Sequence, residues 1–126
     1  MAKEKKDALH KSFGYAFEGI FTCIKKERNM KIHCTAALLV TVCGIFFGIS
    51  YTEWMICLLL FGLVMALELV NTAVEAVVDL VTKERHPLAK IAKDTAAGAV
   101  LIAAIMAAVI GVMIFTPKVL LFIKGI

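Results

Sequence analysis

The sequence predicts an all-α integral membrane protein that forms a single domain over residues 1–126, with one surface helix and three transmembrane helices. Apolar residues make up 61% of the chain and charged residues only 19%, whereas soluble proteins contain about 45–50% and about 25%. A small soluble core could not bury so much apolar surface, because small domains bury a lower fraction of their area. The composition therefore excludes a soluble enzyme, a secreted scaffold and a disordered linker.

Residues 8–25 form the first expected element, an amphipathic helix. Apolar side chains recur at helical spacing from Leu9 to Ile24, and polar ones, including Lys11 and Lys25, fall on the opposite side. This pattern, flanked by lysines, is typical of a helix that lies in the membrane surface. A helix that packs on the protein's own spans would show the same pattern, so both interpretations stay open.

Three later stretches are long enough to cross a bilayer, which takes about 20 mostly apolar residues. They cover residues 32–52, 54–81 and 95–117, and the first and third contain no Lys, Arg, Asp or Glu. We expect Pro117 to end the third span. At 1.5 Å per residue the second helix is about 40 Å long, so its last turns should protrude into the headgroups.

The distribution of Lys and Arg predicts the orientation of the spans. Residues 1–31 carry eight of these cations and residues 82–94 carry four, whereas residues 49–53 carry none. The positive-inside rule then places the N-terminus and the 82–94 loop in the cytoplasm, and the C-terminus outside. The net charge of +4 resembles a nucleic-acid signal, but the cations sit at helix ends and we expect no nucleic-acid partner.

A polar stripe interrupts the second span and is the most informative feature of the sequence. Glu68, Asn71, Glu75 and Asp79 are offset by 3, 7 and 11 residues, which places them on one face of a helix. A carboxylate at membrane depth costs roughly 2.5–3.5 kcal/mol, and such groups usually face a partner or a watery cavity. Because the spans contain no Lys or Arg to pair with it, the stripe indicates a function more than a structural role.

Magnesium chemistry fits this stripe, because Mg²⁺ prefers oxygen ligands and shares its shell with substrate phosphates. Glu27 lies at the same membrane face, and Lys93 and Asp94 enter the third span opposite, where a lysine suits a phosphate oxygen. Glu68 lies deepest, which favours a role as general base toward a lipid hydroxyl. A cation or proton pathway through a transporter or channel is the competing interpretation, and a purely structural subunit is a third.

Small residues on the third span indicate association between helices. Ala99, Ala103, Ala107 and Gly111 are spaced four apart, and small side chains at this spacing let helix backbones approach closely in lipid. Three helices enclose little space, so we expect an oligomer, although alanine could also simply fill an apolar span.

The segment ELVNTAVEAVVDLVTKERHPLAKIAKDTAAGAVLIAA, residues 68–104, resembles the signature of the small prokaryotic diacylglycerol kinase family. The resemblance extends to GYAFEGI at residues 14–20 and to Glu27, so it covers essentially the whole chain. The ERHPLAK loop and the ERNMKIH segment before the first span are more similar to the Gram-positive branch, whose members are typically undecaprenol kinases.

This resemblance implies a homotrimeric helical bundle in the bacterial cytoplasmic membrane, with active sites between subunits on the cytoplasmic side. There, ATP with Mg²⁺ would phosphorylate a lipid alcohol. By motif position Glu68 matches the catalytic base, and Glu27 and Glu75 match the metal-binding carboxylates. The positions that match nucleotide contacts are Tyr15, Glu27, Asn71, Glu75, Asp79, Glu84, Arg85, His86, Lys93 and Asp94.

Two departures from the family pattern concern the lipid headgroup. Ala97 stands where better-known diacylglycerol kinases have a serine, and residues 8–10 lack the arginine that some members place ahead of Gly-Tyr. Glu68 and Ala97 are the positions expected to meet the lipid. Both departures fit a substrate without a glycerol headgroup, so undecaprenol is the expected substrate and diacylglycerol the alternative.

Overall fold

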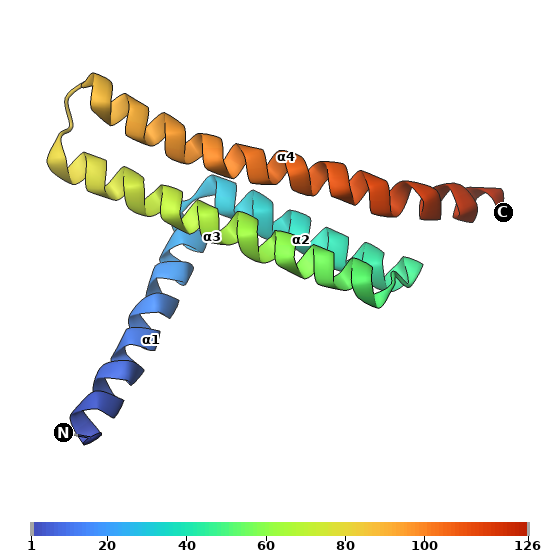
Figure 1. Ribbon diagram of the computed structural model, residues 1–126, viewed down its shortest axis with the longest axis horizontal. Helices are drawn as coiled ribbons and strands as arrows, with labels where there is room; N and C mark the ends of the chain where they lie inside the picture. The colour runs from blue at the N-terminus through green and yellow to red at the C-terminus, as the bar shows by residue number, and fades with distance from the viewer. Residues whose placement is uncertain (1, 126) are drawn as a thin grey trace.

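The computed structural model describes the backbone of residues 2–125 and side chains from residue 8 onward, and these residues form four helices and no strand. The helices are α1 (Ala2–Lys26), α2 (Arg28–Phe47), α3 (Tyr51–Val81) and α4 (Pro87–Lys124). α2, α3 and α4 run alongside one another, and α1 leaves this bundle at a steep angle (Figure 1). The three bundle helices are each long and apolar enough to cross a membrane. The predicted all-α membrane architecture is confirmed.

The first helix contacts the bundle mainly through its last turns. Cys23 is buried, and its Sγ lies 3.4 Å from Thr72 Oγ1 of α3. Farther toward the N-terminus, Leu9, Phe13 and Phe17 each expose more than half of their surface. Most of the apolar face of α1 is therefore not packed on the spans of its own chain, and its place in a membrane surface stays a prediction.

A tight turn joins α2 to α3. The two helices meet there at other residues than the predicted spans 32–52 and 54–81. α2 ends at Phe47 because Gly48 adopts a left-handed conformation with φ 62°, which glycine reaches without steric cost. α3 begins at Tyr51 because Ser50 and Glu53 form a capping box, in which each side chain accepts a hydrogen bond from the other's backbone N–H.

The helix that contains the predicted third span does not end at Pro117, since α4 continues through this residue to Lys124. Proline is tolerated inside spans when surrounding contacts hold the helix in place. Lys118 Nζ lies 3.1 Å from Glu53 Oε1 of α3, and the ring of Phe122 packs edge-on against Phe46 of α2. These contacts fix the last two turns, and α4 extends well beyond the predicted 95–117 at both ends.

A small apolar cluster lies where the α2–α3 turn meets α4. Ile49, Cys57 and Ile114 are buried there, with Trp54 packed against them. Gly44 of α2 makes this possible, because a Cβ at that position would lie 2.7 Å from the Trp54 ring and 3.0 Å from Ile49. The close approach of α2 and α3 at this end therefore depends on the missing side chain.

We predict that Gly44→Ala destabilises the protein by about 1–3 kcal/mol, the usual cost of overpacking a tight site. The matched control is Gly62→Ala on α3, where an added Cβ meets nothing within 4 Å. Thermal unfolding in detergent micelles should show a lower midpoint for Gly44→Ala alone. Equal midpoints for the two variants would contradict the role of the Trp54 contact.

Candidate active site

The polar stripe of α3 forms a gradient of exposure along one helix face. Glu68 and Asn71 are buried, with 1% and 5% of their surface exposed, Glu75 is half-buried, and Asp79 is exposed. From Glu68 to Asp79 the helix rises about 16 Å. The face therefore leads from the protein interior to the charged end of the bundle, as its spacing predicted.

The carboxylate of Glu68 is buried without a hydrogen bond. Neither carboxylate oxygen has a hydrogen-bond partner among the described residues, although such groups in folded proteins are nearly always satisfied. His33 of α2 is the basic residue of the described chain within ion-pair distance, with Nε2 3.7 Å from Glu68 Oε2. That separation exceeds a hydrogen bond, so the carboxylate keeps its capacity to accept a proton or hydrogen bond from a ligand.

Sequence reasoning missed His33 as a neighbour of this carboxylate. The histidine lies 35 positions before Glu68, and a lone histidine near a span end carries no distinctive spacing. Its proximity arises from the packing of α2 against α3. One signal in the sequence could have found this contact. His33 and Glu68 both lie inside predicted spans, at a similar distance from the predicted cytoplasmic face of the membrane.

Asn71 lies between Glu68 and Glu75 along the stripe and is hydrogen-bonded to Glu75 alone of these two. Its Nδ2 donates a hydrogen bond of 3.3 Å to Glu75 Oε1, whereas its Oδ1 is buried without a partner in the described chain. Thr72 Oγ1 donates to the Glu68 carbonyl on the same helix. Three buried oxygens, two from Glu68 and one from Asn71, are thus left available on this face.

Glu27 approaches the stripe from the junction of α1 and α2. It is the N-cap residue of α2, yet its side chain makes no capping hydrogen bond, and both Glu27 and Glu75 lie close enough to Glu68 to interact with it electrostatically. No group of three His, Cys, Asp or Glu in the described residues is arranged to hold a metal ion. The available donors, carboxylate and amide oxygens, are nevertheless the type that Mg²⁺ prefers.

The start of α4 supplies charged groups opposite the stripe. Lys93 Nζ lies 2.7 Å from Asp79 Oδ1, so the expected pairing of Lys93 with the stripe is present. Asp94 pairs instead with Lys90, one turn earlier on α4. Both pairs are exposed to solvent, so each adds little to stability and its charges remain accessible.

The remaining candidate residues lie farther from the buried carboxylate. Glu84, Arg85 and His86 are exposed in the loop between α3 and α4, and His86 Nδ1 accepts a 3.1 Å hydrogen bond from the Leu88 backbone N–H. His86 therefore caps α4, a structural task that Pro87 at the first helical position supports. Tyr15 on α1 is 67% exposed. The structure does not bring these side chains to Glu68.

A cavity of about 260 Å³ brings Ala97 together with the buried end of the stripe. Glu68, Asn71, His33 and Ala97 all border it. The two positions expected to meet a lipid, Glu68 and Ala97, thus share one space. A methyl group at residue 97 leaves that side of the cavity without a hydrogen-bonding side chain.

The family model described as prokaryotic diacylglycerol kinase matches residues 14–115. The chain belongs to this family. It is 50% identical to undecaprenol kinase of Bacillus subtilis over 108 residues, which are 86% of this chain and 88% of that protein. It is also 43% identical to diacylglycerol kinase of Synechocystis over 86% of this chain and 63% of that protein. For Escherichia coli diacylglycerol kinase the identity is 33% over 79% and 81% of the two chains.

The predicted resemblance to the prokaryotic diacylglycerol kinases is therefore confirmed, and with it the enzyme class, a lipid kinase. Membership in this family favours phosphoryl transfer over an ion pathway as the use of the α3 stripe. Three apolar helices of spanning length agree with a membrane enzyme. The roles of individual residues remain predictions of sequence and geometry.

Glu68 should lower the stability of this kinase, because a buried polar group without a partner costs about 1–3 kcal/mol. We predict that Glu68→Met, which keeps a similar volume, raises the thermal unfolding midpoint in micelles at neutral pH. Glu75→Met is the control and should not raise it, because Glu75 accepts a hydrogen bond from Asn71. A lower midpoint for Glu68→Met than for the wild type would mean that Glu68 is satisfied within the fold.

Proposed function

We propose that this chain is an undecaprenol kinase that uses ATP and Mg²⁺ in the bacterial cytoplasmic membrane. The observation that carries the proposal is Glu68, which is almost fully buried at the inner end of a polar stripe and has no hydrogen-bond partner in the described chain. A carboxylate in this state suits proton abstraction from an alcohol. The 50% identity to an undecaprenol kinase supports the lipid assigned.

In the proposed reaction, Glu68 takes the proton from the hydroxyl of the lipid. The alcohol oxygen attacks the γ-phosphorus of ATP, a new O–P bond forms, the bond to the β-phosphate oxygen breaks, and ADP leaves. The low exposure of Glu68 keeps water from competing as the acceptor. Asn71 and Glu75 lie about one and two turns beyond this base on α3, toward the open end of the bundle. They are hydrogen-bonded to each other.

We assign Mg²⁺ to Glu27 and Glu75. Glu75 shares the polar face of α3 with Glu68, and the side chain of Glu27, between α1 and α2, is not used as a helix cap. The Oδ1 atom of Asn71 is a further oxygen without a partner in the described region. When bound, the ion would neutralise the negative charge that develops on the phosphate during transfer.

The nucleotide is assigned to the charged ends of α3 and α4. Lys93 would bind a phosphate as a point charge, and Asp79, which now pairs with it, would hold it in position. We assign the other nucleotide contacts to exposed side chains of α1, of the α3–α4 loop and of α4: Tyr15, Glu84, Arg85, His86 and Asp94.

The proposed topology places the charged ends of α3 and α4 in the cytoplasm, together with α1. It rests on the surplus of Lys and Arg in residues 1–31 and 82–94, and it puts the α2–α3 turn and the C-terminus outside. We propose that residues 1–126 form one kinase unit that assembles as a homotrimer with shared active sites. Support for assembly comes from the small share of each spanning helix that is buried within one chain.

The test is transfer of labelled phosphate from Mg-ATP in mixed micelles, with undecaprenol and diacylglycerol offered separately. We expect transfer mainly to undecaprenol, and we expect Glu68→Gln to lower turnover by roughly two to four orders of magnitude, the usual contribution of a general base. ATP binding should survive in this variant. Wild-type turnover in Glu68→Gln would remove Glu68 as the base.

Diacylglycerol kinase is the second candidate, and the relatives from Synechocystis and Escherichia coli that carry this name favour it. The methyl side chain of Ala97 speaks against it, because it offers no hydrogen bond to a glycerol headgroup. A higher kcat/KM for diacylglycerol than for undecaprenol would correct the substrate and leave the chemistry in place.

The metal assignment predicts that Glu75→Gln weakens Mg-ATP binding by roughly tenfold or more, because losing a charged ligand costs at least about 1.4 kcal/mol. Calorimetric titration of the detergent-solubilised protein measures this directly. Glu18→Gln, which removes an exposed carboxylate from α1, is the control and should bind normally. Wild-type affinity in Glu75→Gln would exclude Glu75 as a ligand.

A further inference from the structure

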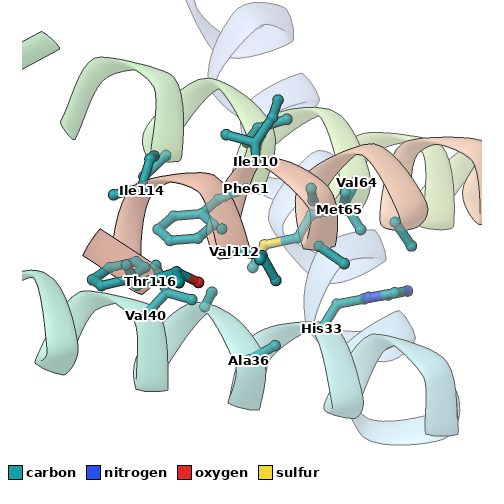
Figure 2. A pocket seen from close by; sticks show the side chains of 18 of the residues that line it. His33, Ala36, Val40, Phe61, Val64, Met65, Ile110, Val112, Ile114 and Thr116 are labelled. Atoms are coloured by element: carbon teal, nitrogen blue, oxygen red, sulfur yellow. The ribbon is translucent and has the colours of Figure 1, made fainter. Parts of the chain in front are cut away.

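His33 of α2 stands beside the buried carboxylate, and the proposed reaction gives it no role. Its Nε2 lies 3.7 Å from Glu68 Oε2, and its side chain is 18% exposed, against 1% for Glu68. Figure 2 shows its ring at one end of an apolar groove between α2 and α4, with the ring nitrogens directed away from Val40 and Thr116. An imidazole in this position can exchange protons with the carboxylate on one side and with solvent on the other.

The proposed reaction places a proton on Glu68 in every turnover, and this proton must leave before the next lipid alcohol can react. Water has little direct access to it, because only 1% of Glu68 is exposed. Neither carboxylate oxygen has a hydrogen-bond partner among the described residues that could pass the proton on. The buried base therefore needs a second group that reaches solvent.

The polar wall of the cavity of about 260 Å³ leads from this carboxylate to the surface. Glu68, His33 and Asn29 all border the cavity. Asn29 and His33 are four residues apart on α2, so they share one face of the helix. Asn29 is exposed and lies next to Arg28, the first residue of α2. Exposure thus increases from Glu68 through His33 to Asn29.

We propose that His33 is a proton relay, which takes the proton from Glu68 after phosphoryl transfer and releases it to solvent near Asn29. The O–H bond of protonated Glu68 breaks and an N–H bond forms at His33 Nε2, which leaves a carboxylate beside an imidazolium. The imidazolium then loses its Nδ1 proton to water, and proton exchange with solvent restores the starting tautomer. This inference rests on the proposed function and goes beyond it by assigning the step that regenerates the base.

The geometry favours His33 over the other charged groups at this end of the bundle. The proposed function commits Glu27 and Glu75 to Mg²⁺, and Lys93 Nζ is paired with Asp79 Oδ1 at 2.7 Å. The 3.7 Å between the histidine and the carboxylate exceeds a hydrogen bond. Catalytic hydrogen bonds are often this long without substrate and tighten when it binds.

Two substitutions of His33 separate proton transfer from packing. His33→Gln keeps a polar side chain of similar size but removes the base, and His33→Ala leaves space for a small molecule beside Glu68. We expect both to lower the kcat for undecaprenol by roughly a hundredfold, a typical loss for a missing proton-transfer group. The KM values for the lipid and for Mg-ATP should stay near those of the wild type. His10→Ala, which removes an exposed histidine from α1, is the control and should leave all constants unchanged.

Chemical rescue tests the relay directly. Added imidazole should restore turnover to His33→Ala, because it can occupy the space of the lost ring and accept the proton. Pyrazole has a ring of the same size but is a much weaker base, so it should not rescue this variant. Imidazole should not rescue Glu68→Gln, which lacks the first proton acceptor, or His33→Gln, whose side chain fills the space. A purely structural role of His33 would not respond to the basicity of the added molecule.

Three results would overturn the relay. They are wild-type kcat in His33→Gln, no rescue of His33→Ala or equal rescue by imidazole and pyrazole, and a raised lipid KM with unchanged kcat, because His33 would then bind the substrate. Thermal unfolding midpoints are measured on the same samples. If His33→Ala does not fold, the kcat of His33→Gln decides.

Failure of the proposed function gives a different pattern. Wild-type turnover in Glu68→Gln would remove the base, and the relay would fall with it. If Glu68→Gln is inactive while His33→Gln turns over as the wild type does, the relay alone is overturned. A preference for diacylglycerol over undecaprenol leaves the test intact, because either alcohol gives its proton to Glu68, and the same loss of kcat is then expected with diacylglycerol.

Discussion

The burial of one carboxylate inside an apolar helix bundle is the constraint on which the rest of this structure depends. Glu68 has no hydrogen-bond partner among the described residues, and a polar group in that state opposes folding. The surrounding helices keep it there through apolar packing and place His33 Nε2 within ion-pair distance of it. In the proposed reaction this arrangement provides a base shielded from water at the expense of stability, a trade that is common at functional sites.

The unequal lengths of the helices separate the charged end of the polar stripe from the apolar part of the bundle. α3 and α4 contain 31 and 38 residues, against 20 for α2, and their joined ends extend past the point where α1 branches from the bundle (Figure 1). Asp79 and Lys93 lie on this extension, where a water-soluble nucleotide can reach them. An apolar groove between α2 and α4 lies on the other side of Glu68. In the proposed reaction the lipid hydroxyl and the γ-phosphate would meet at the buried end of the stripe.

Features set by local periodicity could be predicted from the sequence, and features set by packing between helices could not. Glu68, Asn71, Glu75 and Asp79 share a face because helical spacing requires it, and the same pattern carried the family resemblance. His33 was missed because its partner lies on another helix. The continuation of α4 past Pro117 was not foreseen, because the rule that proline ends helices neglects the Lys118–Glu53 and Phe122–Phe46 contacts beyond it. The groove could not be foreseen, because it depends on how far α2 and α4 lie apart.

The stripe of small residues on α4 illustrates this last point. Its spacing predicted close approach of another helix, and the structure shows that its members have different surroundings. Ala103 is buried, whereas Ala107 and Gly111, one and two turns farther along, border the groove. A missing side chain permits a tight contact where a neighbouring backbone approaches, and it leaves a cavity where none does. The residues are small in both cases. The arrangement of α2 and α3 around α4 therefore decides which of them pack against a neighbour and which border a cavity.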